Sequence, residues 1–487
     1  MKIGFLSLGC PKNLVDSEVM LGIAEQAGHE ITTDADGADV VIVNTCAFID
    51  RAKQESVDTI LEMAERKKAT GARLVVTGCL AERYRAELQK VIPEIDAVLG
   101  TGDVPNILAA LQPGAVAEVG ASPLTFYKRD PGRASEATPA APGQRDPLAA
   151  SRQPLAADPV FGVDLPTYLY DADTPRRLST PGHYAYVKIA EGCDYACAFC
   201  VIPKMRGHYR SRSVESVVAE AGALAGRGVK ELLLVSQDTT FYGIDRGERD
   251  ALPRLIRALD EVDGIEWVRL LYLYPTTITA ATLEAIAASR KVVRYIDLPL
   301  QHASDRVLKR MKRPGTRASY ERLLAGIRAR IPDVVLRTTF IVGFPGETEA
   351  DVAELLAFVS AVGFDHVGVF TYSHEEDTSA HALPDDVPTA EKARRQRRVM
   401  ALQKRLVAAR QKARVGSRVR LVVDGASPEH EWVWTGRLAG QAPDIDPQVF
   451  LTDADPAALR PGQFLDAEIV GARGYDLIAR PAAPDAR

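Results

Sequence analysis

Six cysteines occur in this 487-residue chain, and they fall into two sets of three. One set is closely spaced in E-G-C-D-Y-A-C-A-F-C and comprises Cys193, Cys197 and Cys200. The other set is spread along the first part of the chain, each member after an apolar run, and comprises Cys10, Cys46 and Cys79. A cuboidal iron-sulfur cluster has four irons, so three thiolates leave one iron free to bind a substrate or cofactor. The sequence therefore predicts two sites of reaction chemistry.

The composition indicates a soluble protein of a reducing compartment. The net charge is −5, and the start of the chain lacks a basic region followed by a long apolar run. No apolar stretch of about 18 residues occurs anywhere. We therefore expect a cytoplasmic protein without membrane contact. In a reducing cytosol, cysteines are metal ligands or catalysts more often than disulfide partners.

Strand and helix patterns alternate over residues 1–111. Strands are predicted at 2–8, 39–44 and 73–77, with helices at 15–26 and 51–67. This alternation is typical of a parallel sheet, in which ligands bind beyond the carboxyl ends of the strands. Since the three distant cysteines follow the three strands, we expect them to converge on one site at this edge. Three separately buried structural thiols are the alternative.

Residues 112–182 are predicted to be a linker, because periodicity fails there and residues 133–159 are rich in Ala, Pro, Gln and Asp. A second alternation of strands and helices then fills residues 183–415. Its six predicted strands lie at 184–190, 231–236, 267–272, 295–298, 334–342 and 366–371. Six β/α units without a seventh or eighth predict a partial barrel, with its chemistry at the carboxyl ends of the strands.

A small third unit is predicted over residues 416–487, after a long basic helix at 389–414. Short strands separated by Pro, Gly and Asp predict an antiparallel barrel, and they lie at 418–423, 449–451, 464–470 and 475–479. The predicted fold class is therefore α/β. It combines an N-terminal parallel α/β domain, a central partial β/α barrel and a C-terminal small antiparallel β-barrel.

The spacing C-x₃-C-x₂-C after the first barrel strand is the strongest local motif. Short spacers allow three thiolates to point inward from one loop. Zinc is the alternative metal, but structural zinc usually has four nitrogen or sulfur ligands, and neither His183 nor His208 is close to the motif. The motif resembles that of the radical S-adenosylmethionine (SAM) enzymes. The resemblance implies that the open iron chelates SAM and that electron transfer cleaves SAM to a 5′-deoxyadenosyl radical.

The same resemblance suggests residues that contact SAM. Phe199 precedes the last cysteine of the motif, in a position that implies a place near the adenine. Ser236 and Gln237 follow the second strand and are candidates for the methionine part of SAM. Arg337 and Gly343 lie in V-L-R-T-T-F-I-V-G-F-P-G-E-T-E and are candidates for carboxylate, ribose or adenine contacts. Packing is the alternative role for each. No acid or base is predicted to be catalytic, since an unactivated C–H bond has no acidity to exploit.

The distributed cysteines lie in S-L-G-C-P-K-N-L-V-D-S-E, V-N-T-C-A-F-I and V-T-G-C-L-A-E-R-Y, which resemble the amino-terminal domain of the methylthiotransferases. The terminal unit is similar to the TRAM domain of those enzymes, so the resemblance covers nearly the whole chain. It implies that Cys10, Cys46 and Cys79 hold a second 4Fe-4S cluster, which carries the sulfur to be inserted. It also implies that one SAM methylates this sulfur and another supplies the radical that abstracts a substrate hydrogen.

Two branches share this machinery. One modifies isopentenyladenosine in transfer RNA, and the other modifies the β-carbon of an aspartate in small-subunit ribosomal protein S-twelve. The motifs I-D-L-P-L-Q-H, Y-S-H-E-E-D-T and G-Q-A-P-D-I-D resemble the ribosomal-protein branch. From Arg418 onward there are 11 acidic residues against seven arginines and no lysine, which favours a basic protein partner over RNA. Gln441, Asp444 and Asp446 are the expected partner contacts. A solvated acidic surface and the transfer RNA enzyme remain alternatives.

Further partners are expected. The chemistry needs an electron donor, and a basic run on the long helix makes adjacent ribosomal RNA a candidate contact; the run comprises Lys392, Arg394, Arg395, Arg397 and Arg398. A charged run on a helix is more often a solvated face. Two other classes are a two-cluster electron carrier, which would saturate each cluster with four cysteines, and a nucleic-acid-binding module, which the acidic terminal unit disfavours.

Overall fold

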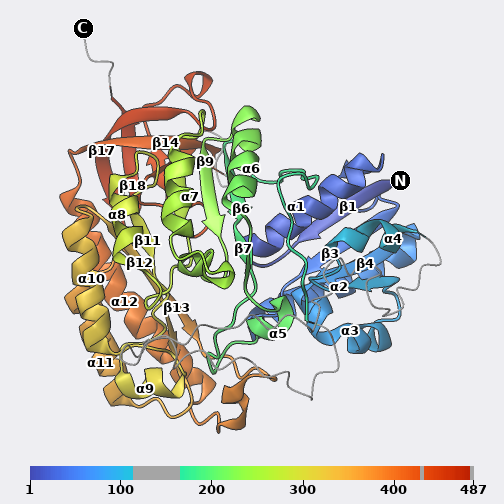
Figure 1. Ribbon diagram of the computed structural model, residues 1–487, viewed down its shortest axis with the longest axis horizontal. Helices are drawn as coiled ribbons and strands as arrows, with labels where there is room; N and C mark the ends of the chain where they lie inside the picture. Colours follow the sequence, from blue (N-terminus) through green and yellow to red (C-terminus); the bar gives the residue numbers. More distant parts are fainter. Residues whose placement is uncertain (113–164, 428–432, 483–487) are drawn as a thin grey trace, which may run out of the picture.

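The computed structural model describes residues 1–112, 165–427 and 433–482. Three units follow one another along the chain, an α/β domain, a partial barrel and a small terminal barrel (Figure 1). This arrangement confirms the predicted fold class. The Ala/Pro-rich stretch predicted at 133–159 lies outside the described residues. Within the described ranges, no helix is long and apolar enough to cross a bilayer.

The first domain is built on a parallel sheet with the strand order β2-β1-β3-β4-β5. Its strands are β1 (Lys2–Ser7), β2 (Glu30–Thr32), β3 (Val40–Thr45), β4 (Arg73–Gly78) and β5 (Ala97–Leu99). Its helices are α1 (Pro11–Gln26), α2 (Asp50–Thr70), α3 (Cys79–Val91), η1 (Val104–Asn106) and α4 (Ile107–Leu111). Every residue of β3 is buried, as expected for a central strand covered on both faces. The short strands β2 and β5 were not predicted, because three residues carry no usable periodicity.

The central unit has six parallel strands that lie side by side, in two groups of three, β6-β9-β10 and β11-β12-β13. A bridge between Val268 and Val292 joins the groups. The strands are β6 (Tyr184–Lys188), β9 (Glu231–Val235), β10 (Trp267–Leu270), β11 (Tyr295–Asp297), β12 (Val335–Val342) and β13 (His366–Thr371). All six predicted barrel strands are therefore present. No ladder joins β6 to β13 in the described ranges, so the barrel is open on that side.

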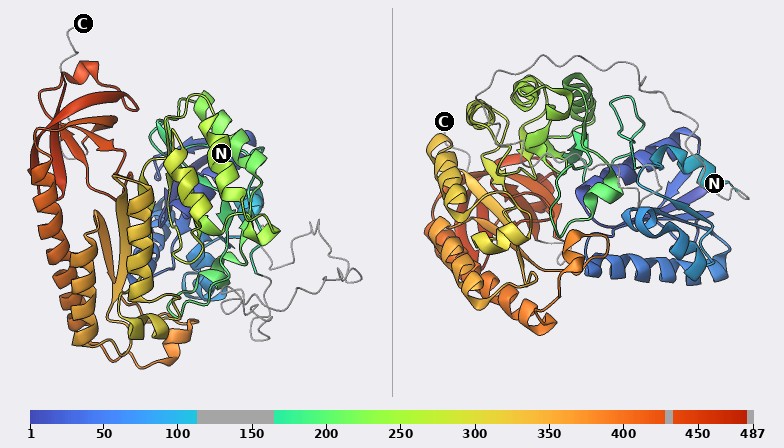
Figure 2. Two further views of the ribbon diagram at one scale, coloured as in Figure 1. Left: turned by 60° about the vertical axis from the view of Figure 1, so that its left-hand side comes forward. Right: turned by 60° about the horizontal axis from the view of Figure 1, so that its bottom comes forward.

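Helices cover the outside of this open barrel, as the two views of Figure 2 show. The larger ones are α6 (Val214–Gly226), α7 (Ala251–Asp260), α8 (Ala280–Ala288), α10 (Arg317–Arg330), α11 (Glu349–Val362) and α12 (Thr389–Ala413). The shorter elements are β7 (Ala190–Glu191), α5 (Ile202–Arg206), β8 (Arg210–Ser211), η2 (Thr239–Phe241), η3 (Ile244–Arg246), α9 (Asp305–Arg310) and η4 (Ser379–Ala382). Local sequence sets the helix ends: the Ser213 side chain caps α6, and Gly363 ends α11 in the left-handed conformation.

The terminal barrel closes in the order β14-β15-β16-β18-β17. Its elements are β14 (Arg418–Ala426), β15 (Trp434–Leu438), β16 (Val449–Leu451), η5 (Pro456–Ala458), β17 (Phe464–Arg473) and β18 (Asp476–Pro481). Strand β15 was not predicted. The pairing of β16 with β18 is parallel, so the predicted antiparallel barrel is wrong for that one pair. The β16–β18 pair closes the barrel, and a closed barrel has no free strand edge.

The terminal barrel covers the amino ends of the central strands (Figure 1). Arg437 of β15 donates to Glu231, the first residue of β9, at 2.7 Å, and Arg269 of β10 donates to the same carboxylate at 2.8 Å. All three side chains are at most 2% exposed. Two arginines around one buried carboxylate fix the position of the terminal barrel, because breaking a buried ion pair across this contact is strongly destabilising.

Part of the predicted linker is a packed connection. Residues 165–182 contain no helix or strand, yet Tyr170 is buried and Arg176 is an anchor. The Arg176 guanidinium pairs with Glu18 of α1 at 2.6 Å and with Glu220 of α6 at 2.5 Å. Ion pairs with two other units hold this stretch in place. Such long-range pairs leave no periodic pattern in the local sequence.

Candidate iron-sulfur and cofactor sites

The three distant cysteines lie at one edge of the first sheet. Cys10 follows β1, Cys46 follows β3, and Cys79 follows β4 as the first residue of α3. Gly9 has φ +95°, and a Cβ built there would lie 2.9 Å from the Cβ of Cys46. Only glycine permits this approach of the two loops. The convergence expected from the strand pattern is therefore a property of the backbone.

The electrostatics of these thiols fit a cluster. Burial, followed by the neighbouring Cys79 and Cys10, raises the pKa of Cys46 to about 12. Burial also raises the pKa of Cys79, which Cys10 approaches closely enough to add to the shift. Three crowded thiolates repel one another unless a cationic core lies between them. In the described part of the chain, no three His, Cys, Asp or Glu side chains converge on a single-ion position, and a four-iron cluster, being wider, does not require such convergence.

Arg206 joins this trio to the central barrel, although no sequence motif indicated this role. It ends α5, the helix after the close-spaced cysteines, and is 2% exposed. Its guanidinium donates to Cys79 Sγ at 3.3 Å and to Asp16 at 2.6 Å. A donor to a thiolate stabilises its negative charge, and hydrogen bonds to cluster sulfurs raise a reduction potential. Arg206 thus ties the first-domain trio to the barrel.

Replacement of Arg206 by methionine should destabilise the contact between the first domain and the barrel. The change leaves Asp16 and Glu191 with a single cation, Lys188. Breaking a buried pair of this kind costs about 3–5 kcal/mol. Arg85→Met, which breaks the more exposed pair with Asp103, should cost about 1 kcal/mol or less. Thermal unfolding midpoints measure both, and equal midpoints would contradict the role of Arg206.

The close-spaced trio occupies the loop after β7, at the carboxyl end of the barrel. The amide of Cys193 donates to the Gly207 carbonyl at 3.0 Å, and that of Cys200 to the Cys197 carbonyl at 3.1 Å. Burial, followed by the neighbouring Cys197, raises the pKa of Cys200 to about 12. Arg313 lies 3.8 Å from Cys197 Sγ and over the ring of Tyr274. The trio therefore has its own local loop and its own neighbouring cation.

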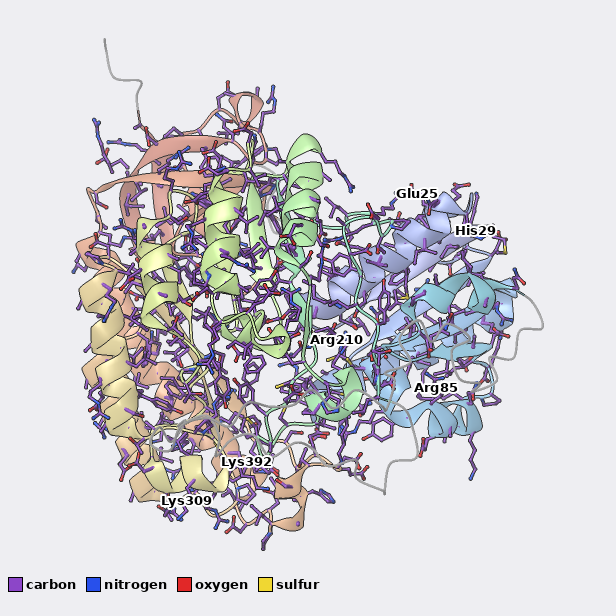
Figure 3. All side chains as sticks on the ribbon, in the orientation of Figure 1. Glu25, His29, Arg85, Arg210, Lys309 and Lys392 are labelled. Atoms are coloured by element: carbon purple, nitrogen blue, oxygen red, sulfur yellow. The ribbon has the colours of Figure 1, made fainter. Side chains whose placement is uncertain are left out.

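Four of the five cofactor candidates lie at this carboxyl end. Ser236 is fully buried just after β9, and Gln237 donates to Glu191 at 2.5 Å while its buried Oε1 has no partner among the described residues. Phe199 packs in a small cluster with Phe344 and Tyr372. Gly343 follows β12, and a Cβ there would lie 2.3 Å from Cγ of Lys392, which Figure 3 labels. The free oxygen of Gln237 fits a polar ligand.

Arg337 lies away from these candidates. It is the third residue of β12, near the amino end of the barrel. Its guanidinium donates to Asp297 at 2.9 Å and lies 3.4 Å from Asp446 of the terminal barrel. Because β12 spans eight residues, roughly 25 Å separates its ends. A cofactor contact by Arg337 would require it to leave both carboxylates.

The predicted partner contacts do not form one open surface. Gln441 is 3% exposed and accepts from the Leu438 amide at 2.8 Å. The Asp446 side chain is 2% exposed and accepts from Tyr295 at 2.7 Å. Asp444 stays exposed but accepts from Tyr186 at 3.0 Å. Asp444 and Asp446 thus bond the central barrel, whereas Gln441 bonds within the terminal barrel, and a charge count over the sequence cannot reveal this.

Replacement of Asp446 by asparagine should therefore loosen the terminal barrel. The carboxylate accepts hydrogen bonds from Tyr295 and the Ala442 amide beside Arg337, and hydrogen bonds to a charged group are worth about 1.5–3 kcal/mol each. We expect a lower thermal unfolding midpoint than for Asp466→Asn, which changes an exposed carboxylate of the same barrel. An unchanged midpoint together with weakened partner binding would favour the partner-contact role.

The carboxyl edges of the first sheet and the barrel face each other. Buried Glu375, after β13, accepts from Arg83 of α3 at 2.7 Å and from Lys53 of α2 at 2.8 Å. Arg210, labelled in Figure 3 between the two units, donates to the Tyr168 carbonyl at 2.6 Å. Lys12 of α1 donates to the Ser236 carbonyl at 3.3 Å. The two cysteine trios therefore open toward one shared space.

Three family models match the chain. Residues 2–100 match a family described as Uncharacterized protein family UPF0004, residues 187–359 match the Radical SAM superfamily, and residues 415–481 match the TRAM domain. The matched regions carry the distributed cysteines, the close-spaced cysteines and the terminal barrel in turn. The domain bounds expected at 111, 182 and 415 remain predictions.

Curated relatives are similar over nearly the full length. The ribosomal protein uS12 methylthiotransferase RimO of Koribacter versatilis is 49% identical, and the match covers 98% of this chain and 96% of that protein. RimO of Symbiobacterium thermophilum is 46% identical, covering 99% of this chain and 92% of that protein. Among solved structures, a radical SAM methyltransferase, TsrM from Kitasatospora setae, has a TM-score of 0.52 at 18% identity. It covers 76% of this chain and 72% of its own, which shows a shared fold alone.

Proposed function

Because the chain belongs to the family of ribosomal protein uS12 methylthiotransferases named RimO, we propose that it inserts a methylthio group at the β-carbon of an aspartate in uS12, the protein also written S-twelve. The single observation that carries this proposal is the full-length similarity to these relatives. The two three-cysteine sites on facing edges support it independently, since the reaction needs a hydrogen-abstracting centre and a sulfur-donating centre close together.

Radical SAM enzymes use a 4Fe-4S cluster and SAM. In our proposal Cys193, Cys197 and Cys200 hold this cluster, and Cys10, Cys46 and Cys79 hold a second one. When bound, the first cluster supplies an electron and chelates SAM, and the second supplies the sulfur. One cysteine of each trio, Cys79 and Cys193, is buried, the other four are partly exposed, and Gly9 lets two cysteine loops approach closely.

The side chains at the barrel mouth orient SAM in this proposal. Gln237 has a buried amide oxygen without a described partner, which accepts from an ammonium or hydroxyl group. Gly343 follows β12 and is buried against the Lys392 side chain, so a backbone contact with SAM there requires Lys392 to move. Phe199 offers an apolar surface beside the cysteine loop. Arg337 is not part of this set, because its ion pairs tie it to the other end of the barrel.

The transfer RNA enzyme is the less favoured alternative. The relatives named for uS12 match nearly the whole chain, and the terminal unit is acidic in sequence. The basic run on α12 offers RNA little free charge, because Lys392, Arg394, Arg395 and Arg398 all pair with carboxylates. The radical chemistry requires an electron donor as a further partner. A ribosomal substrate is consistent with a cytoplasmic location.

Mass spectrometry tests the proposed function. Purified uS12 is incubated with the anaerobically reconstituted enzyme, SAM and a reductant, and one aspartate should gain a methylthio group in place of a hydrogen. Transfer RNA containing isopentenyladenosine serves as the parallel substrate and should stay unmodified. Modification of the RNA but not of uS12 would establish the alternative.

A further inference from the structure

Lys12 is a buried cation without a carboxylate partner. Its side chain belongs to α1, directly after Cys10, and the residue is 8% exposed. Nζ donates to the Ser236 carbonyl at 3.3 Å and lies 3.7 Å from the centre of the Tyr272 ring. Across the described ranges it forms no ion pair. A carbonyl and a ring face compensate a buried ammonium only in part, since buried charges are normally paired.

The other cations of this region are neutralised. Lys188 and Arg206 share the carboxylates of Asp16 and Glu191. Lys12 also sits in the first turn of a helix, where the macrodipole disfavours positive charge. The nearby carboxylates already pair with other cations. A lysine in this position therefore fits a site that binds an anionic ligand.

The position of Lys12 indicates where that anion lies. Lys12 is two residues from Cys10, and its ammonium reaches the Ser236 carbonyl just after β9, at the carboxyl end of the barrel. Tyr272, beneath the ammonium, has φ +59°, which is costly for a tyrosine, and its amide donates to Asp297 at 3.0 Å. Strain of this kind concentrates at ligand sites. The ammonium therefore lies between the two trios, at the barrel mouth.

We propose that Lys12 binds the side-chain carboxylate of the substrate aspartate. This inference rests on the proposed function and names the residue that selects its substrate. The carbon that receives the methylthio group is bonded directly to the carboxylate carbon, so an anchor on the carboxylate fixes its C–H bonds relative to both trios. An amide in place of the carboxylate leaves the ammonium unpaired again, which selects against asparagine. The carboxylate of SAM is the other source of the same chemistry.

Paired substitutions, one at Lys12 and one at the target aspartate of uS12, test the proposed contact through binding affinity. The aspartate that the enzyme modifies is located by mass spectrometry, and uS12 is prepared with that residue as Asp or as Asn. The reconstituted wild-type holoenzyme should bind the Asp form about 10- to 100-fold more tightly, as expected for a hydrogen-bonded charged pair. Lys12→Met should abolish this preference, and Lys12→Arg should restore part of it. Lys90→Met, the same change at an exposed position of the same domain, should retain the wild-type preference.

The outcomes separate the possibilities. If Lys12→Met keeps the preference for Asp, Lys12 does not bind the substrate carboxylate. If Lys12→Met weakens SAM binding about 10- to 100-fold when uS12 is absent, Lys12 binds the carboxylate of SAM and the inference is overturned. If the wild-type enzyme modifies no uS12, the proposed function itself fails. Iron content and thermal midpoint report folding, and if Lys12→Met does not load iron, Lys12→Gln against Lys12→Arg decides the same question.

Discussion

Replacing Cys193, Cys197 and Cys200 together with alanine is expected to halve the iron of the reconstituted protein, from about eight irons per chain to about four. The reason is that the two trios belong to different units. The barrel trio is ordered by its own loop, through amide bonds such as that from Cys193 to Gly207 at 3.0 Å. Iron and sulfide analysis after anaerobic reconstitution measures the loss, and SAM cleavage should disappear with it.

The matched control is the triple alanine variant of Cys10, Cys46 and Cys79. It should also retain about four irons, while the variant without any cysteine should retain none. Near eight irons in either triple variant would contradict the assignment of one cluster to each trio. Zinc in place of iron at the barrel trio would support the zinc interpretation of that motif. Elemental analysis distinguishes the two metals.

The strand pattern predicted the framework of both sites. Cys10, Cys46 and Cys79 follow apolar runs, and the carboxyl ends of neighbouring parallel strands share an edge, so their convergence follows from topology. The six central strands were found for the same reason. Strands β2, β5 and β15 were missed because they are short or lack alternation, and their place comes from pairing with neighbours.

The polar residues of the sites were harder to predict. Arg206 and Arg313 approach cysteines from segments whose sequence contains no recognisable motif. Lys12 did leave a signal, since a lysine in the first turn of a helix is electrostatically unfavourable and this one directly follows the Cys10 motif. Arg337 also left one: it is near the start of its predicted strand, whereas barrel chemistry lies at strand ends. Asp446 left none, because net charge does not show which carboxylates a domain contact covers.

Replacing Cys46 alone with alanine should abolish methylthiolation and leave reductive cleavage of SAM to 5′-deoxyadenosine. Cys46 lies after β3 in the first domain, and the barrel loop that carries the other trio does not depend on it. Its backbone is held by Ser56, whose hydroxyl bonds both the amide and the carbonyl of Cys46 at 3.0 Å. Loss of the thiol therefore removes a ligand without moving the loop, so the effect should be chemical and not structural.

Two measurements on the Cys46→Ala protein make the test decisive. Product analysis with uS12 should show no methylthio group, and assays without uS12 should still show 5′-deoxyadenosine. Ser56→Ala is the matched control: it removes both hydrogen bonds to the Cys46 backbone but keeps the thiol, and should retain some methylthiolation. If Cys46→Ala loses all SAM cleavage while the barrel site still holds about four irons, the two trios do not divide the work, and radical formation depends on the first domain as well.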